Sequence, residues 1–232
     1  MRIAILANTL PAALPIYEEV ERSGKGEVFV VLCPAADGGA RETVKHAGRL
    51  LLKPGRSKSV NLWRRRKLIV LRRPLDHPQS ATRLSRLGFD LGLHKSGNIY
   101  RENTIKSFRL GILNAHIGLL PAYRGRNVAE WAILEGRPVG ISVFFVDAGI
   151  DTGERIVLKE EVDVSRCESL AAAKQYLFNL DAVFYRRALE LLESGPGSFL
   201  SNDASGRRYF VMSNCFQRLA EKIFLSNKVS NN

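Results

Sequence analysis

Short apolar runs alternate with a helix-forming segment along the N-terminal part of the chain, and this alternation most constrains the fold. Residues 2–8 (RIAILAN) and 27–33 (EVFVVLC) have the length and the β-branched content of buried strands. Residues 16–22 between them fit a helix whose start is delayed by Pro11 and Pro15. Strand, helix and strand in this order predict an α/β protein with an open, mostly parallel, doubly wound sheet. Ligands of such sheets bind beyond the carboxyl ends of the strands.

The same pattern continues along most of the chain. Asn127 with Glu130, and Ser165 with Glu168, have the spacing of capping boxes at the start of a helix. Further strands are expected at residues 88–93, 109–113, 139–146 and 154–162, the last of them at a sheet edge, and further helices at 41–51, 102–108, 127–136 and 165–194.

We expect one catalytic domain, residues 1–194, and a short C-terminal extension, residues 195–232. The last residues of the extension are rich in serine and asparagine and are expected to be disordered. The loop after the first strand, Ala7–Pro11, has no GxGxxG pattern, which argues against a dinucleotide site. Residues 62–73 fit either a strand or a helix.

Cysteine content and hydropathy argue against several classes of protein. The three cysteines are far apart and form no CxxC pair, which favours reduced thiols and no zinc site. The N-terminal residues enter the first strand without an apolar signal region. No apolar run approaches the roughly 18 residues that cross a membrane. We therefore expect a cytoplasmic protein without a membrane partner and without a bound metal.

Positive charge is concentrated in one stretch of the chain. The formal net charge is +12, and residues 49–86 contain twelve lysines or arginines and one acidic residue, Asp76. Such a stretch can attract an anionic partner, such as a nucleotide, a polyglutamylated folate or a nucleic acid. A basic surface that only contacts water is an equally good interpretation. Trp63 among the arginines fits either base stacking or the edge of the core.

The side chains that most clearly indicate a chemical function lie within residues 109–125 and 147–153. Asn114 and His116 follow an apolar strand two residues apart, so in extended backbone both side chains point to one face. Asp151 lies on a glycine-flanked turn. An amide can hydrogen-bond an oxyanion, an imidazole can carry charge or move a proton, and a carboxylate can support that imidazole. Because the motif has no serine or cysteine nucleophile, these groups predict direct acyl transfer to an incoming amine.

Two motifs resemble the catalytic core of the folate-dependent formyltransferases. They are Asn114-x-His116-x-x-Leu119-Leu120-Pro121-x-Tyr123-Arg124-Gly125 and Asp147-x-Gly149-Ile150-Asp151-Thr152-Gly153. The resemblance covers residues 88–163 and implies an open α/β fold and transfer of formyl from 10-formyltetrahydrofolate to an amine. It places the family's catalytic residues on Asn114, His116 and Asp151, although each of these alone fits an ordinary turn or strand end. Many members have serine two residues after the histidine; here Gly118 stands there, and a hydroxyl that could fix the loop or touch a ligand is missing.

The resemblance also implies where folate binds. In the family, two loops lie beside the folate pocket, and the first lines it mainly through backbone groups. They correspond here to His94, Lys95, Ser96 and Gly97, and to Val146, Asp147, Gly149 and Ile150. The resemblance implies no metal.

These observations predict an N-formyltransferase that uses 10-formyltetrahydrofolate and a small anionic amine, with a nucleotide-linked amino sugar as the expected acceptor. Nucleic acid is not expected as a partner. Methionyl-tRNA members carry a further C-terminal β-barrel, for which residues 195–232 are too few, and glycinamide ribonucleotide members carry a glycine-rich loop that Asn8–Pro11 lacks.

The same site could pass formyl to water, as in a formyltetrahydrofolate hydrolase, although such enzymes often carry an N-terminal regulatory domain. A third interpretation is a basic module that binds a nucleotide or RNA and whose formyltransferase scaffold has lost its activity. The sequence is compatible with a monomer and with an oligomer.

Overall fold

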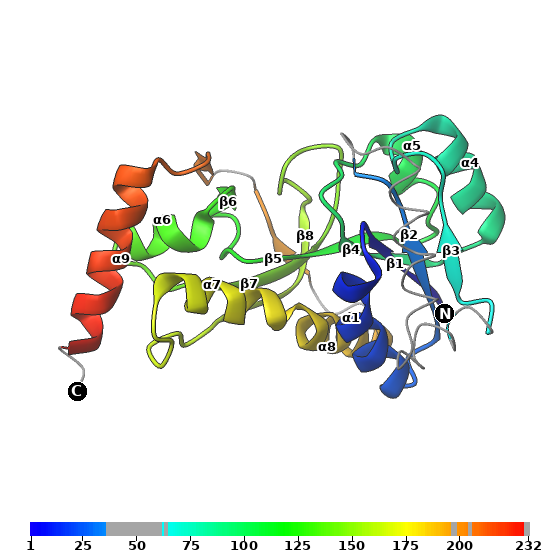
Figure 1. Ribbon diagram of the computed structural model, residues 1–232. Coiled ribbons are helices and arrows are strands. Elements are labelled where there is room, and N and C mark those ends of the chain that lie inside the picture. The colour runs from blue at the N-terminus through cyan, green and yellow to red at the C-terminus, as the bar shows by residue number, and fades with distance from the viewer. Residues whose placement is uncertain (36–61, 63–64, 196–198, 204–205, 230–232) are drawn as a thin grey trace, which may run out of the picture. The chain divides into compact units, whose positions relative to one another are not determined.

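The computed structural model describes residues 1–35, 62, 65–195, 199–203 and 206–229 (Figure 1). The chain forms two compact units. The first comprises Met1–Asn114 and Val146–Ala148, and the second comprises Ala115–Phe145 and Gly149–Asn232. The expected domain boundary after residue 194 stays a prediction.

The first unit is built on parallel strands. Its described strands are β1 (Arg2–Ala7), β2 (Glu27–Leu32), β3 (Leu68–Val70), β4 (Leu91–Lys95) and the first residues of β5 (Gly111–His116). Their order is β3-β2-β1-β4-β5, and each of these neighbouring pairs is parallel. Every residue of β1 after Arg2 is buried, because a parallel sheet is covered on both faces.

Helices cover both faces of these strands. α1 (Leu10–Arg22) joins β1 to β2, and α4 (Pro78–Leu87) joins β3 to β4 in the opposite direction along the sheet. Right-handed crossovers that run in opposite directions place their helices on opposite faces. Figure 1 shows α1 on one side and α4 with α5 (Glu102–Ile105) on the other. The mostly parallel α/β sheet with flanking helices that the sequence predicts is confirmed.

Some boundaries in this unit differ from the sequence-based expectation. α1 includes both Pro11 and Pro15 rather than beginning after them. Pro11 lies in the first turn, where its missing N–H costs no intrahelical bond, and Pro15 is tolerated inside the helix. Gly88 does not begin a strand, because at φ +63° it ends α4. β4 therefore starts later than expected and includes His94 and Lys95.

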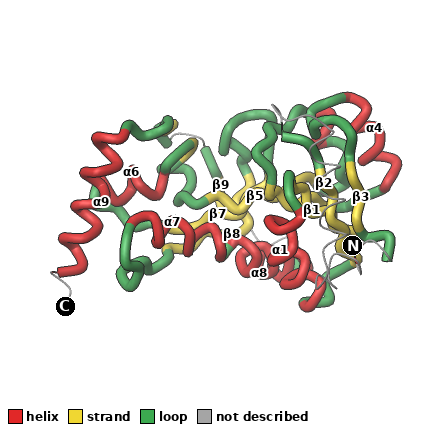
Figure 2. Tube along the Cα trace, in the orientation of Figure 1, coloured by secondary structure: helices red, strands yellow, loops and turns green. Residues whose placement is uncertain are grey.

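The second unit combines antiparallel strands with helices. Its elements are β6 (Arg124–Gly125), α6 (Val128–Leu134), β7 (Gly140–Phe145), β8 (Arg155–Glu161), α7 (Leu170–Asn179), α8 (Asp181–Glu193), β9 (Leu200–Ser201), β10 (Arg208–Tyr209) and α9 (Asn214–Val229). β8 pairs antiparallel with β7 and with β9, and β10 pairs parallel with β6. α8 packs on β7 and β8, and α6 packs against α9 (Figure 2).

The helix expected over residues 165–194 is divided in two. Ser169, not Ser165, caps the first part, because its hydroxyl accepts a hydrogen bond from the Ala172 N–H at 3.1 Å. The helix is interrupted at Leu180, between α7 and α8. The capping box at Ser165 was therefore a wrong prediction, although the predicted helical content on both sides of Leu180 is present.

Asn127 precedes α6 as expected, but it does not cap the helix through the predicted box. Its backbone has φ +53°, and its Nδ2 donates to Glu130 Oε1 at 2.6 Å. Its Oδ1 instead accepts a hydrogen bond from the Met212 N–H at 3.4 Å. The expectation that β8 is an edge strand is wrong at its start, where β9 pairs with Arg155 and Ile156.

Several predictions fall outside the described residues. These are the helix at 41–51, the stacking of Trp63 and most of the basic stretch before residue 65. Of residues 62–73, the described part contains β3, which confirms the strand alternative for Leu68–Val70, whereas Leu62 is helical.

Asp90 joins separate parts of the first unit. Its Oδ2 accepts a hydrogen bond from the Arg2 N–H, and its Oδ1 accepts one from Arg109 Nε, each at 2.7 Å. The bond from the Arg109 guanidinium, and then that from the Arg2 backbone, hold the Asp90 pKa below its usual range. A carboxyl with a lowered folded-state pKa stabilises the fold above its unfolded pKa of about 3.9. This contribution is lost as the pH falls through the lower folded value.

We expect Asp90→Asn to lower the free energy of unfolding by only about 1 kcal/mol at pH 7, because Arg109 is exposed to water. Urea titrations should show this difference at pH 7 and its disappearance as the pH falls below about 3.9. Glu27→Gln is the control, since it removes an exposed ion pair of Arg2 and should cost less than about 0.5 kcal/mol. An equal loss in both variants at every pH would contradict this role for Asp90.

Candidate active site

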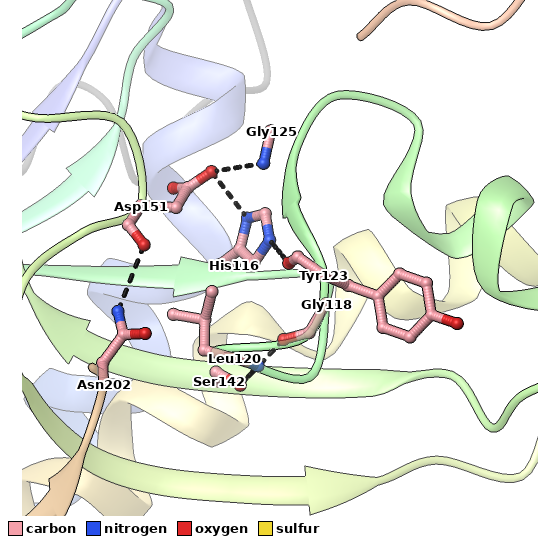
Figure 3. Close-up of polar contacts among 8 residues, drawn as sticks. All are labelled: His116, Gly118, Leu120, Tyr123, Gly125, Ser142, Asp151 and Asn202. Atoms are coloured by element: carbon pink, nitrogen blue, oxygen red, sulfur yellow. Dashed lines mark hydrogen bonds and ion pairs between the residues drawn. The ribbon is translucent and has the colours of Figure 1, made fainter. Parts of the chain in front are cut away.

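His116 is the last residue of β5, and only 8% of its side chain is exposed. Its Nε2 lies 2.9 Å from the Tyr123 carbonyl oxygen, and its Nδ1 lies 3.6 Å from Asp151 Oδ2 (Figure 3). Because a carbonyl oxygen only accepts, Nε2 carries the hydrogen of this bond. The second ring nitrogen therefore faces the carboxylate.

Asp151 lies on the loop after β7, with a left-handed backbone at φ +53° and a side chain that is 12% exposed. Its Oδ2 accepts a hydrogen bond from the Gly125 N–H at 3.0 Å. Its carbonyl oxygen accepts a hydrogen bond from the Asn202 amide at 3.1 Å (Figure 3). Contacts to both its side chain and its backbone therefore hold the carboxylate beside His116.

The turn after His116 is held by Ser142, which is fully buried. Ser142 Oγ donates to the Gly118 carbonyl oxygen at 2.7 Å and accepts from the Leu120 N–H at 3.0 Å. Gly118 has no room for a side chain, because a Cβ there would lie 2.6 Å from His116 Nε2 and 2.8 Å from the Tyr123 carbonyl oxygen. The absence of a side chain at Gly118 therefore allows the Tyr123 carbonyl to reach the His116 ring.

The His116–Asp151 pair can support negative charge on a reacting oxygen. The 3.6 Å between Nδ1 and Oδ2 is longer than a hydrogen bond, so a hydrogen on Nδ1 is available to a substrate oxygen. When both ring nitrogens carry hydrogen, the carboxylate can balance the positive charge of the ring. The low exposure of both side chains strengthens this interaction, because little water screens it.

Asn114 lies on β5 two residues before His116 and is half-buried. It is the last residue of the first unit before the chain enters the second. Side chains two residues apart on a strand point to the same face. Its part in the chemistry stays a prediction.

The family model for formyl transferase matches residues 72–189, half of the chain, and this range includes both His116 and Asp151. The chain belongs to the formyl transferase family. The matched range ends before Asn202 and before β10.

Curated relatives of the chain are methionyl-tRNA formyltransferases that are longer than the stretch it matches. The methionyl-tRNA formyltransferase of Syntrophus aciditrophicus (strain SB) is 29% identical over 197 residues, which are 83% of this chain and 60% of the relative. The chain spans 28% of the length of another methionyl-tRNA formyltransferase, from Ruminiclostridium cellulolyticum, and 63% of the length of one from Anaeromyxobacter dehalogenans.

Solved structures of formyltransferases share the fold. A sugar N-formyltransferase from Shewanella sp FDAARGOS_354 has a TM-score of 0.65 at 13% identity, with 97% of this chain and 88% of that chain covered. The formyltransferase PseJ from Anoxybacillus kamchatkensis, in complex with UDP-4,6-dideoxy-4-formamido-L-AltNAc and tetrahydrofolate, has a TM-score of 0.56 at 17% identity. That match covers 96% of this chain and 97% of PseJ.

The first segment predicted to bind folate begins inside β4. His94 and Lys95 end the strand, so their expected loop position is wrong, and Ser96 and Gly97 follow in a bend. His94 Nδ1 lies 2.5 Å from the Tyr100 hydroxyl oxygen, and the two rings meet edge-on at 5.2 Å. His94 is therefore tied to Tyr100 within the first unit.

The second predicted segment passes from partly buried residues to exposed ones. The Val146 N–H donates to the Ile112 carbonyl oxygen at 2.8 Å, and the Val146 side chain packs against the core of the first unit. Asp147 is half-buried, and Gly149 and Ile150 are exposed. Folate binding by either segment stays a prediction.

Sequence reasoning missed the polar residues that surround the first segment. Asn8 Oδ1 accepts a hydrogen bond from the Gly97 N–H at 2.7 Å, and Asn8 Nδ2 donates to the Cys33 carbonyl at 3.1 Å. Asn98 donates to Cys33 Sγ at 3.3 Å. Burial raises the pKa of the Cys33 thiol to about 12, so the thiol stays neutral. One signal was available: Asn8 and Cys33 directly follow the first two strands, at the carboxyl ends where ligands of such sheets bind.

Among the residues that the structure describes, no group of three or more histidine, cysteine, aspartate or glutamate side chains could hold a metal ion. None of the described helices has the length and apolar character needed to cross a membrane. That the reaction needs no metal stays a prediction.

Proposed function

We propose that the chain is an N-formyltransferase that moves a formyl group from 10-formyltetrahydrofolate to an amine. The observation that carries this proposal is the buried His116–Asp151 pair, which the backbone of Tyr123 and Gly125 holds in a chain of the formyl transferase family. Tetrahydrofolate in the complex of the neighbour PseJ supports a folate donor. A cytoplasmic location is proposed because Cys33, Cys167 and Cys215 lie far apart in the sequence and form no CxxC pair.

In the proposed reaction, the lone pair of the acceptor nitrogen attacks the formyl carbon and forms the new C–N bond. The formyl oxygen gains negative charge and accepts hydrogen bonds from the Asn114 amide and from His116 Nδ1–H. Collapse of this species breaks the bond between the formyl carbon and folate N10, which takes the electron pair. The proton lost by the acceptor amine reaches N10 through Asp151 and water. Folate is held by residues 94–97 and 146–150.

The proposed acceptor is a small anionic amine, with a nucleotide-linked amino sugar as first choice. A net charge of +12 favours a phosphorylated acceptor. A sugar N-formyltransferase and PseJ, whose complex contains a formamido sugar nucleotide, are structural neighbours, whereas the curated relatives are methionyl-tRNA formyltransferases. Because nucleotide-linked amino sugars and methionyl-tRNA both contain phosphate, the net charge of the chain does not distinguish between these two acceptors.

The test is to incubate the protein with 10-formyltetrahydrofolate and one amine at a time, and to follow the absorbance of the tetrahydrofolate product. We expect turnover with a nucleotide-linked amino sugar and none without an amine. Glycinamide ribonucleotide and charged initiator methionyl-tRNA are compared at the same salt concentration, since salt weakens phosphate contacts. Efficient formylation of the tRNA with no turnover of any amino sugar would overturn the acceptor choice and keep the activity.

Two other outcomes would overturn the activity itself. Formate release in the reaction without amine would indicate a formyltetrahydrofolate hydrolase. A salt-dependent shift of RNA, with no turnover of the donor under any condition, would indicate a binding module on a decayed scaffold.

A further inference from the structure

The groups that hold the His116–Asp151 pair come from one short segment. The Tyr123 carbonyl accepts the hydrogen bond from His116 Nε2, and the Gly125 N–H donates to Asp151 Oδ2 (Figure 3). The position of the segment Tyr123–Gly125 therefore sets the orientation of both the ring and the carboxylate.

This segment is itself paired with the C-terminal part of the chain. Strand β6 pairs with β10, with Gly125 opposite Tyr209, and the Arg126 N–H donates to the Tyr209 carbonyl oxygen at 3.1 Å. The two backbones approach so closely that a Cβ on Gly125, where φ is +104°, would lie 2.1 Å from the Tyr209 carbonyl oxygen. The contact therefore depends on glycine at position 125.

Side chains reinforce this backbone pairing. The rings of Tyr123 and Tyr209 stack with centroids 5.2 Å apart and an interplanar angle of 19°. Both hydroxyls donate to the Glu135 carboxylate, at 2.8 Å from Tyr123 and at 2.9 and 3.0 Å from Tyr209. Burial, and then the hydrogen bond to Glu135, raise the pKa of both tyrosines, so their hydroxyls stay protonated and remain donors.

A second C-terminal contact holds the other loop of the site. Asn202 is 1% exposed, and its amide donates to the carbonyl oxygens of Asp151 and Gly153 at 3.1 and 3.0 Å. Asn202 and Tyr209 both lie beyond residue 189, where the family match ends. The C-terminal segment thus touches both loops that meet at the His116–Asp151 pair.

We propose that Asn202 and Tyr209 are positioning residues, and that their contacts hold the catalytic loops in their reactive arrangement. Displacing catalytic groups by about 1 Å can cost a hundredfold in rate, so loss of this support should lower kcat without removing any reacting group. The expected effect on kcat rests on the proposed formyl transfer, whereas the expected effect on the orientation of His116 and Asp151 does not.

Tyr209→Ala and Phe210→Ala are a matched pair for the test. Both remove an aromatic ring from neighbouring residues, but Phe210 is 66% exposed, whereas Tyr209 is 7% exposed and stacks on Tyr123. We expect Tyr209→Ala to lower kcat about tenfold or more, with KM for the folate donor changed less than about threefold. Phe210→Ala should keep both constants, and Tyr209→Phe, which keeps the ring, should recover much of the lost kcat. Equal kcat in Tyr209→Ala and Phe210→Ala would overturn the inference.

A second measurement does not need turnover. The ¹⁵N NMR signals of the His116 ring, identified by their loss in His116→Ala, report which nitrogen carries the hydrogen. We expect Tyr209→Ala to change these signals and Phe210→Ala to leave them unchanged. If wild-type protein turns over no amine but the signals change as expected, the proposed function fails and the positioning role stands. If Tyr209→Ala does not fold, Asn202→Ala decides, because it removes the amide that donates to the carbonyl oxygens of Asp151 and Gly153. His116 signals and kcat equal to those of Phe210→Ala would then overturn the inference.

Discussion

His116→Ala and Asp151→Asn are each expected to lower kcat about a hundredfold or more, the usual effect of losing an oxyanion donor or an acid–base group. In the proposed mechanism, alanine removes the Nδ1–H that donates to the formyl oxygen. Asparagine keeps the shape of Asp151 and tolerates its left-handed backbone at φ +53°, but it cannot balance the charge of the imidazolium. Steady-state kinetics with 10-formyltetrahydrofolate and the acceptor found by the amine screen would measure both effects.

Both variants should fold, because each changes a polar group at the end of a strand or in a loop. Asp163→Asn is the matched control for Asp151→Asn, since Asp163 is on a loop of the same unit and its Oδ1 accepts a hydrogen bond from the nearby Ser165 N–H. Its kcat should stay within about twofold of the wild-type value. Near-normal turnover by His116→Ala, with circular dichroism like that of the wild type, would remove the histidine from the mechanism.

The strands could be predicted from the sequence, because a strand buried on both faces is a continuous apolar run. Residues 2–8 and 27–33 therefore located β1 and β2 closely. The predicted helix boundaries were wrong where one residue type is compatible with two local structures. Gly88 fits the start of a strand as well as the left-handed end of a helix, and Pro11 fits a delayed helix as well as a first turn. Local sequence does not decide between these alternatives.

The expected catalytic residues could be located because they stand in short motifs, whereas the residues that hold them could not. Ser142 is a lone polar residue inside an apolar strand, and its partner Gly118 is 24 residues away. Asn202 lies 51 residues from Asp151, beyond the region that resembles the family. No spacing rule connects such pairs, because tertiary packing alone brings them together.

Gly118 determines how the His116 ring can be oriented. With glycine there, the Tyr123 carbonyl lies 2.9 Å from Nε2 and holds the hydrogen on that nitrogen. Any side chain would begin with a Cβ 2.6 Å from Nε2, 2.8 Å from the same carbonyl and 2.9 Å from Val128 Cγ2. These atoms belong to the backbone, to a buried valine and to the His116 ring, so none of them can move without changing the candidate site.

Gly118→Ala and Gly118→Ser are therefore expected to lower kcat about a hundredfold, because the ring must move by about 1 Å to admit the new carbon. The serine hydroxyl would not restore activity, since the clash is at Cβ. Gly136→Ala is the control: nothing lies within 4 Å of its new Cβ, so at φ +65° it should cost about 1 kcal/mol of stability and leave kcat unchanged. Full activity of Gly118→Ser would mean that His116 works in another orientation, without the Tyr123 carbonyl. The contacts of residues 123–125 would then no longer explain how the catalytic ring is held.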